Sequence, residues 1–238
     1  MNPEREIFRE PEINAKEGEL RNPNLEKEGQ WKVLEEKFKK ETDRLGYEIE
    51  PGIFDVVVAL NALGINTRQS CEGHVDRGRT APWVDVQYPN QPRRFTQEER
   101  IEKEVAKESN LSLNEVENAQ GDKGYEAWQE VQRRVATVPE ETSEYIEWMK
   151  ENERLLKKVK GILGEFYQER QVSENVKLTL SDMGPSDFTL YNGGKDYSLI
   201  FKERKISKQQ KEKLTRRLEE YRKEFQEFAQ FLKEKFFK

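Results

Sequence analysis

Two long segments, residues 140–172 and 206–237, carry apolar side chains at the three- and four-residue spacing of an amphipathic helix. A helix of about 30 residues is about 45 Å long, so these two would be the longest elements of the fold. The stripe positions are Tyr145, Met149, Leu156, Val159, Leu163 and Phe166 in the first segment and Leu214, Leu218, Tyr221, Phe225, Phe228 and Leu232 in the second. We expect a long helix pair that packs stripe to stripe, in the manner of a coiled coil.

Charged residues make up 37% of the chain and hydrophobic residues 34%, so the apolar positions must be concentrated on a few faces. The apolar run from Pro51 to Gly64 predicts a buried core helix, and the pattern from Leu25 to Gly46 predicts an amphipathic helix. Strands are expected at residues 65–70 and 82–89, with three more within 175–204. This order predicts an α+β fold, with a mixed or antiparallel sheet of about five strands and helices packed mainly on one face.

The domain organisation follows from the same patterns. Residues 1–24 are rich in proline and have little periodicity, which predicts an extended or loosely ordered arm. Residues 25–238 are expected to form a single α+β domain, in which 95–137 is a helical excursion. Capping-box spacing marks helix starts at Thr96 with Glu99, Ser112 with Glu115, Thr137 with Glu140, and Ser207 with Gln210.

Net charge and cysteine content limit which cellular location and which partners we expect for this protein. A single cysteine excludes an internal disulfide, and the opening residues are polar throughout, so we expect neither a leader peptide nor a membrane segment. These features predict a cytoplasmic protein. The net charge of −5 disfavours nucleic acid as a partner, although the locally basic run 202–238 remains a candidate surface for it.

The segment 71–74, CEGH, contains the only cysteine and the only histidine of the chain. A closed structural zinc site takes four cysteine or histidine ligands, so this chain cannot build one alone. An open metal site remains possible, formed by Cys71, His74 and a carboxylate, either Asp76 or Asp85. The sequence therefore leaves a metal as one alternative and identifies no cofactor.

Two further chemistries suit the same segment. Cys71 could act as a nucleophile with its pKa lowered by His74 and by nearby arginines, while Asp76 or Asp85 orients His74. Alternatively, the segment could bind a phosphate or carboxylate group without covalent chemistry. The candidate ligand-binding residues are Arg68, Ser70, Glu72, Gly73, Arg77, Arg79 and Trp83. A purely structural interpretation also stands, with a buried cysteine, a hydrogen-bonded histidine and solvated arginines.

The pattern Thr67, Ser70, Cys71 and Gly73, with His74 at the basic position, resembles the T-x-S-S-C-S-G-R segment of the methyltransferase family of tRNA wybutosine synthesis. Glu72 and His74 stand where that family has serine and arginine. The resemblance implies methyl transfer from S-adenosylmethionine to tRNA. The sequence SCEGH followed by PWVD is also similar to a group of bacterial and phage proteins of unassigned function.

The leading functional prediction is a pocket around residues 71–74 that binds a small anionic ligand, a nucleotide or related metabolite. Hydrolysis or group transfer with Cys71 and His74 is the reaction class expected if the ligand is turned over, which would make the protein a hydrolase or transferase. One alternative is a structural or interaction protein that acts through its long helices, for example as a homodimer. Another is a nucleic-acid-associated protein related to tRNA modification.

Overall fold

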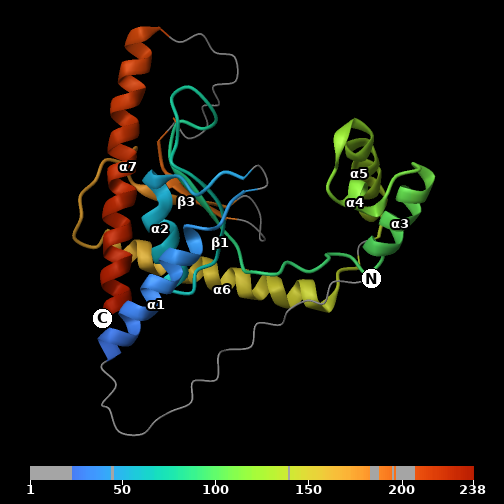
Figure 1. Cartoon of the computed structure of the whole chain (residues 1–238), viewed down its shortest axis with the longest axis horizontal. Coiled ribbons are helices and arrows are strands. Elements are labelled where there is room, and N and C mark those ends of the chain that lie inside the picture. Colours follow the sequence, from blue (N-terminus) through green and yellow to red (C-terminus); the bar gives the residue numbers. More distant parts are fainter. Residues whose placement is uncertain (1–22, 44–45, 139, 183–187, 195, 197–206) are drawn as a thin grey trace, which may run out of the picture.

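The structure is a computed structural model that describes residues 23–43, 46–138, 140–182, 188–194, 196 and 207–238 (Figure 1). Along the chain its elements are α1 (Pro23–Phe38), α2 (Pro51–Ala62), β1 (Thr67–Cys71), β2 (Trp83–Val86), α3 (Glu98–Glu108), α4 (Leu113–Glu117), α5 (Gly121–Val135), α6 (Ser143–Phe166), β3 (Leu178–Asp182), β4 (Phe188–Asn192) and α7 (Lys208–Phe237). None of the described helices is both long enough and apolar enough to cross a lipid bilayer.

The sheet is antiparallel, with strand order β1-β2-β4-β3. It confirms the predicted α+β class, with four described strands. The fifth expected strand, the last of the three within 175–204, falls outside the described residues. Because side chains alternate along a strand, the cross-strand row of Ser70, Val84 and Leu190 belongs to one face, and the row of Cys71, Trp83 and Tyr191 belongs to the other.

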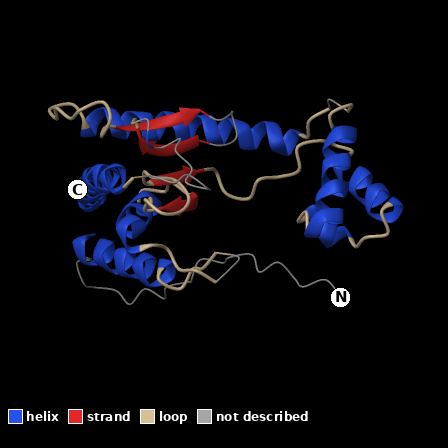
Figure 2. Ribbon diagram, turned by 90° about the horizontal axis from the view of Figure 1, so that it is seen from above, coloured by secondary structure: helices blue, strands red, loops and turns tan. Residues whose placement is uncertain are grey.

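The main core lies on the Val84 face of the sheet, where α2, α6 and α7 cover it (Figure 2). The predicted apolar helix is α2, and it is apolar nearly all round because α1, α7 and β1 all pack against it. Pro51 occupies its first turn, where its missing N–H costs nothing, and Gly64 ends it at φ +69°. This helix brings the residue before Pro51 to the end of β1.

The two long helices cross instead of forming the predicted helix pair. Figures 1 and 2 show α6 running transverse to α7, and the ring of Phe166, at the end of α6, lies 5.1 Å from the ring of Phe228. The predicted stripe of α7 is buried within the monomer, mainly against α2. The predicted stripe-to-stripe coiled coil is therefore wrong, because the apolar stripe of α7 belongs to the core of the monomer.

The N-terminal helix is shorter than predicted. It ends at Phe38, because the chain then turns: Thr42 pairs with Glu48, and the Asp43 N–H donates to the Tyr47 carbonyl. Gly46, expected to end the helix, belongs to this turn at φ +82°. Of the predicted arm 1–24, only Pro23 and Asn24 are described, and they begin α1.

The helical excursion 95–137 forms a cluster of its own, α3, α4 and α5, on the right of Figure 1. It has a separate small core that includes Ile101, Val116 and Val131. The Ser112–Glu115 capping box forms as predicted at the start of α4. The Thr96–Glu99 box does not, because Glu98 instead accepts from the N–H groups of Arg94 and Phe95. We refer to these three helices as the helical cluster.

Candidate functional site

Cys71 is the last residue of β1, and His74 lies in the loop that leads from β1 to β2. The loop is pinned by the His74 N–H, which donates to the Arg79 carbonyl at 2.8 Å. Gly73 has φ +77°, and a Cβ on it would lie 2.7 Å from the Ala81 carbonyl carbon and 2.9 Å from Leu218 of α7. Only glycine fits here, because the loop must turn through the left-handed region while touching α7.

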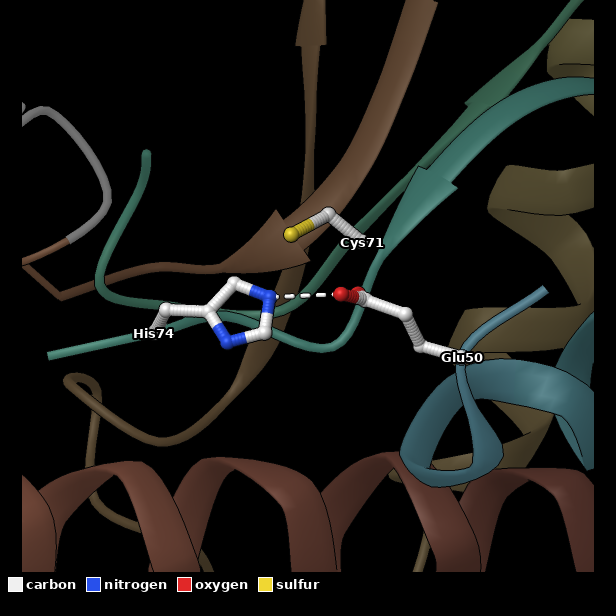
Figure 3. A group of neighbouring side chains, drawn as sticks. All are labelled: Glu50, Cys71 and His74. Carbon is white, nitrogen blue, oxygen red and sulfur yellow. Dashed lines mark hydrogen bonds and ion pairs between the residues drawn. The ribbon is translucent and has the colours of Figure 1, made fainter. Parts of the chain in front are cut away.

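A third side chain, Glu50, completes the group that contains Cys71 and His74 (Figure 3). Glu50 immediately precedes α2, and its Oε1 lies 2.6 Å from His74 Nε2. Its Oε2 accepts from the Glu72 N–H at 2.8 Å, and its carboxylate also bonds to the Cys71 thiol. Figure 3 shows the sulfur, the imidazole and the carboxylate turned toward one another. We call these three residues the Glu50–Cys71–His74 cluster.

The cluster is held by a second group of charges. Glu72 accepts from the Gly52 N–H at 2.7 Å, which ties the loop to the first turn of α2. Arg222 of α7 donates to the Glu72 carboxylate at 2.7 Å, to the Glu72 carbonyl at 2.9 Å and to the Gly73 carbonyl at 2.7 Å. Three elements therefore fix the position of the cluster: the start of α2, the end of β1 and the middle of α7.

The electrostatics of the cluster do not favour a thiolate. Burial raises the pKa of Cys71 to about 11, and the carboxylates of Glu50 and Glu72 add to this effect, while the Gly73 N–H opposes it. Burial also acts to raise the pKa of Glu50, but the Glu72 N–H and His74 outweigh it and hold this pKa below its usual value. The sequence-based expectation of a Cys71 pKa lowered by His74 and arginines is therefore wrong, because the thiol is buried and its closest charged partners are carboxylates.

The group is half-buried, not sealed. The side chains of His74 and Glu50 keep 14% and 28% of their exposure, so solvent reaches both. The Arg77 side chain is 71% exposed, and its Nη2 lies 3.4 Å from Glu50 Oε1 and 3.4 Å from His74 Nε2. An exposed cation thus lies at the outer edge of the cluster.

Comparisons with protein-family models, with curated proteins and with solved structures give no match. The function of the site must therefore be argued from its own geometry, and both sequence resemblances stay predictions.

The predicted carboxylates do not orient His74. The Asp85 carboxylate accepts from Thr189 Oγ1 at 2.6 Å on the neighbouring strand β4. Asp76 is exposed and makes no hydrogen bond or ion pair to any described residue. Among the described residues the carboxylate in contact with His74 is that of Glu50, so the roles predicted for Asp76 or Asp85, as metal ligand or as orienting base, are reassigned to Glu50, which the start of α2 brings to the end of β1.

The other predicted ligand residues are spread around the loop. The Arg79 guanidinium lies 5.1 Å from the centre of the Trp83 ring, and Trp83 pairs with Cys71 in the sheet. Ser70 belongs to the core face, opposite to Cys71, so it is removed from the predicted ligand set. Arg68 is exposed near the start of β1. The structure thus brings together Cys71, His74, Glu72, Gly73 and Arg77.

Sequence reasoning missed Glu50 and Arg222. A weak signal existed for each. Glu50 is the residue before a helix-starting proline, a position whose side chain is placed at a helix N-terminus. Arg222 follows Leu214 and Leu218 at four-residue intervals, so a guanidinium continues an apolar line of α7.

Proposed function

We propose that this chain binds a small anionic ligand, a nucleotide or a related metabolite, at the Glu50–Cys71–His74 cluster. The observation that carries the proposal is Arg77, an exposed guanidinium within 3.4 Å of the only imidazole of the chain. Arg77 lies at a long 3.4 Å from both Glu50 Oε1 and His74 Nε2, and Glu50 also has the Glu72 N–H and His74 as closer partners, so an incoming anion can compete for the guanidinium. An anion at this position would lie between Arg77 and His74.

The surroundings of the cluster suit a ligand that also carries a ring. Arg79 and Trp83 form a stacked cation–indole pair, and the Trp83–Cys71 pairing places that indole beside the thiol. Aromatic and guanidinium planes are the surfaces on which protein sites stack nucleobases. This arrangement favours a nucleotide over a bare inorganic anion.

The chemistry that the cluster supports is hydrolysis or group transfer. Glu50 holds the imidazole of His74 by a 2.6 Å contact, which is the arrangement of an oriented general acid or base. Cys71 enters as a protonated thiol, so its role is to donate a hydrogen bond and not to attack. We place the protein in the cytoplasm, where a reducing environment keeps this single thiol free.

Calorimetric titration with ADP, in low salt and with EDTA present, tests the proposal. Arg77→Ala should weaken binding by about 10- to 100-fold, because a hydrogen bond to a charged group contributes about 1.5–3 kcal/mol. Arg133→Ala is the matched control: it removes the same charge from the exposed surface of α5 and leaves the affinity unchanged. Inorganic phosphate in the same assay isolates the contribution of the base. Equal affinities of the two variants, or no binding of ADP, would contradict the proposal.

The same assay separates the alternative functions. The nucleic-acid alternative predicts that a tRNA or a single-stranded oligonucleotide binds most tightly at low salt. The methyltransferase resemblance predicts binding of S-adenosylmethionine. Either result, with no binding of ADP, would replace the present proposal.

A further inference from the structure

We infer that the Glu50–Cys71–His74 cluster is a site for one zinc ion with an open coordination position. The inference deepens the proposed function, because a metal with an open position would give the anion a second contact beside Arg77. Its first support is geometric: the Cys71 sulfur, a His74 ring nitrogen and a Glu50 carboxylate oxygen all lie within 4.8 Å of one another. Cys71 and His74 come from one short segment, residues 71–74, and the fold adds Glu50 from the start of α2.

The kinds of ligand indicate the metal. Sulfur and imidazole nitrogen with one carboxylate oxygen are the donors that zinc takes, whereas calcium and magnesium prefer oxygen alone. Three protein ligands leave the fourth tetrahedral position for water or for a bound group, as in catalytic zinc sites. The fourth position would face the exposed Arg77, which is the side from which an anion enters.

Outer hydrogen bonds hold two of the three ligands in place. The Glu72 N–H fixes Glu50 Oε2, and the Arg79 carbonyl fixes the backbone of His74. Arg222 in turn holds the Glu72 and Gly73 carbonyls. Partners of this type orient metal ligands and contribute to metal affinity.

Zinc binding at the cluster has a defined proton balance. The thiol proton of Cys71 leaves to solvent as the Zn–S bond forms, while His74 binds as a neutral imidazole that keeps its one proton on the ring nitrogen that does not bind the metal, and Glu50 binds as a carboxylate. No oxidation or reduction takes place. Without metal, the same three groups satisfy one another by hydrogen bonds, so the competing interpretation is a hydrogen-bonded trio with no affinity for an ion.

Zinc titration of the full-length, EDTA-treated protein against a chromophoric chelator decides between the two. We expect one zinc ion per chain. Cys71→Ser and Glu50→Gln should each lower the affinity by more than the roughly 10- to 100-fold that loss of an outer partner costs. Asp76→Asn is the matched control, since it neutralises a nearby exposed carboxylate that has no described partner, and it should leave zinc affinity unchanged.

Cobalt substitution supplies a readout that does not depend on affinity. Co²⁺ bound to a thiolate gives a near-ultraviolet charge-transfer band, which we expect in the wild type and which Cys71→Ser should abolish. Because serine nearly matches cysteine in size, this variant keeps the test informative if Glu50→Gln fails to fold, as circular dichroism would show. Absence of stoichiometric zinc binding, or a cobalt band that survives in Cys71→Ser, would overturn the inference.

The two proposals fail separately. The zinc titration contains no anion, and the ADP titration contains EDTA. Binding of ADP that requires Arg77, together with no zinc affinity, would overturn the metal site alone. Zinc bound through Cys71, with no binding of ADP at any metal content, would support the metal site and contradict the proposed binding of an anionic ligand.

Discussion

The helical cluster and the region around Glu50, Cys71 and His74 both depend on charged residues, but they use them differently. In the helical cluster many ion pairs link residues three or four apart on an exposed helix, such as Arg133 with Glu130 and Arg100 with Glu104. At the site, Arg222 reaches Glu72, 150 residues away in sequence, and both side chains are partly buried. Such pairs in the helical cluster act within one helix, although Arg134 of α5 also reaches Glu108 of α3, whereas the pair at the site joins elements that are far apart in the sequence.

The difference indicates which charged residues contribute most to the stability of the fold. An exposed pair between neighbouring turns contributes about 0.3–0.5 kcal/mol, because water competes for both partners. Arg222 donates to two carbonyls and a carboxylate at the junction where α2, β1 and α7 meet. Removing its guanidinium leaves these partly buried acceptors without their donor. Substitutions at the junction should therefore cost far more than substitutions in the helical cluster.

The largest effect is expected at Gly73. Gly73→Ala places a methyl group against the backbone of Ala81 and Pro82 at a positive φ, so it should lower the free energy of unfolding by about 3–4 kcal/mol. Gly78→Ala in the same loop also has positive φ but open space around it, and should cost only about 1 kcal/mol. Urea denaturation measures both values. Equal costs would show that the close contact of the loop with its neighbours is not needed.

The next effect is expected at Arg222. Arg222→Ala leaves the Glu72 carboxylate and two carbonyls without their donor, and should lower the free energy of unfolding by about 2–4 kcal/mol. Arg133→Ala, in the helical cluster, should leave the free energy of unfolding almost unchanged, because water solvates both exposed partners. Urea denaturation of the two variants compares the regions directly. Similar losses would break the distinction between local and long-range charge pairs.

Local patterns predicted much of the fold. The apolar run gave α2, alternation and turn residues located the described strands, and two capping boxes, Ser112–Glu115 and Ser207–Gln210, formed as expected. The box at Thr137 did not form, because Thr142 caps α6 instead. Spacing alone could not tell which of several nearby polar residues would take the free amides at a helix start.

Part of the site could also be predicted from local sequence. Cys71 and His74 are the only cysteine and histidine of the chain and lie three residues apart, so the sequence identified them as candidate site residues. Glu50 is one of 47 acidic residues, and only the packing of α2 against the end of β1 brings it to His74. The α7 stripe was also identified correctly, but periodicity does not name a partner. The helix therefore packs against α2 and not along α6.

The smallest effect concerns alkaline pH and also separates the two regions. Tyr221 of α7 donates to the Asp196 carboxylate at 3.0 Å, and burial, followed by the charge of Asp196, raises its pKa to about 12. A raised pKa contributes stability that is complete below the unfolded value of about 10 and is lost as pH rises toward 12. By about pH 11 this group alone should lower the free energy of unfolding by about 1 kcal/mol.

Tyr221→Phe tests that prediction by urea denaturation at several alkaline pH values. The variant is less stable at neutral pH, since it lacks the hydrogen bond to Asp196, but its stability should fall less steeply above about pH 10. A remaining slope is expected from Tyr167, whose pKa burial also raises. Tyr125→Phe, an exposed ring in the helical cluster, is the matched control and should keep the wild-type slope. If Tyr221→Phe keeps that slope too, the junction around α7 does not set the alkaline limit, because a phenol that ionises equally in the folded and unfolded chains leaves the free energy of unfolding unchanged.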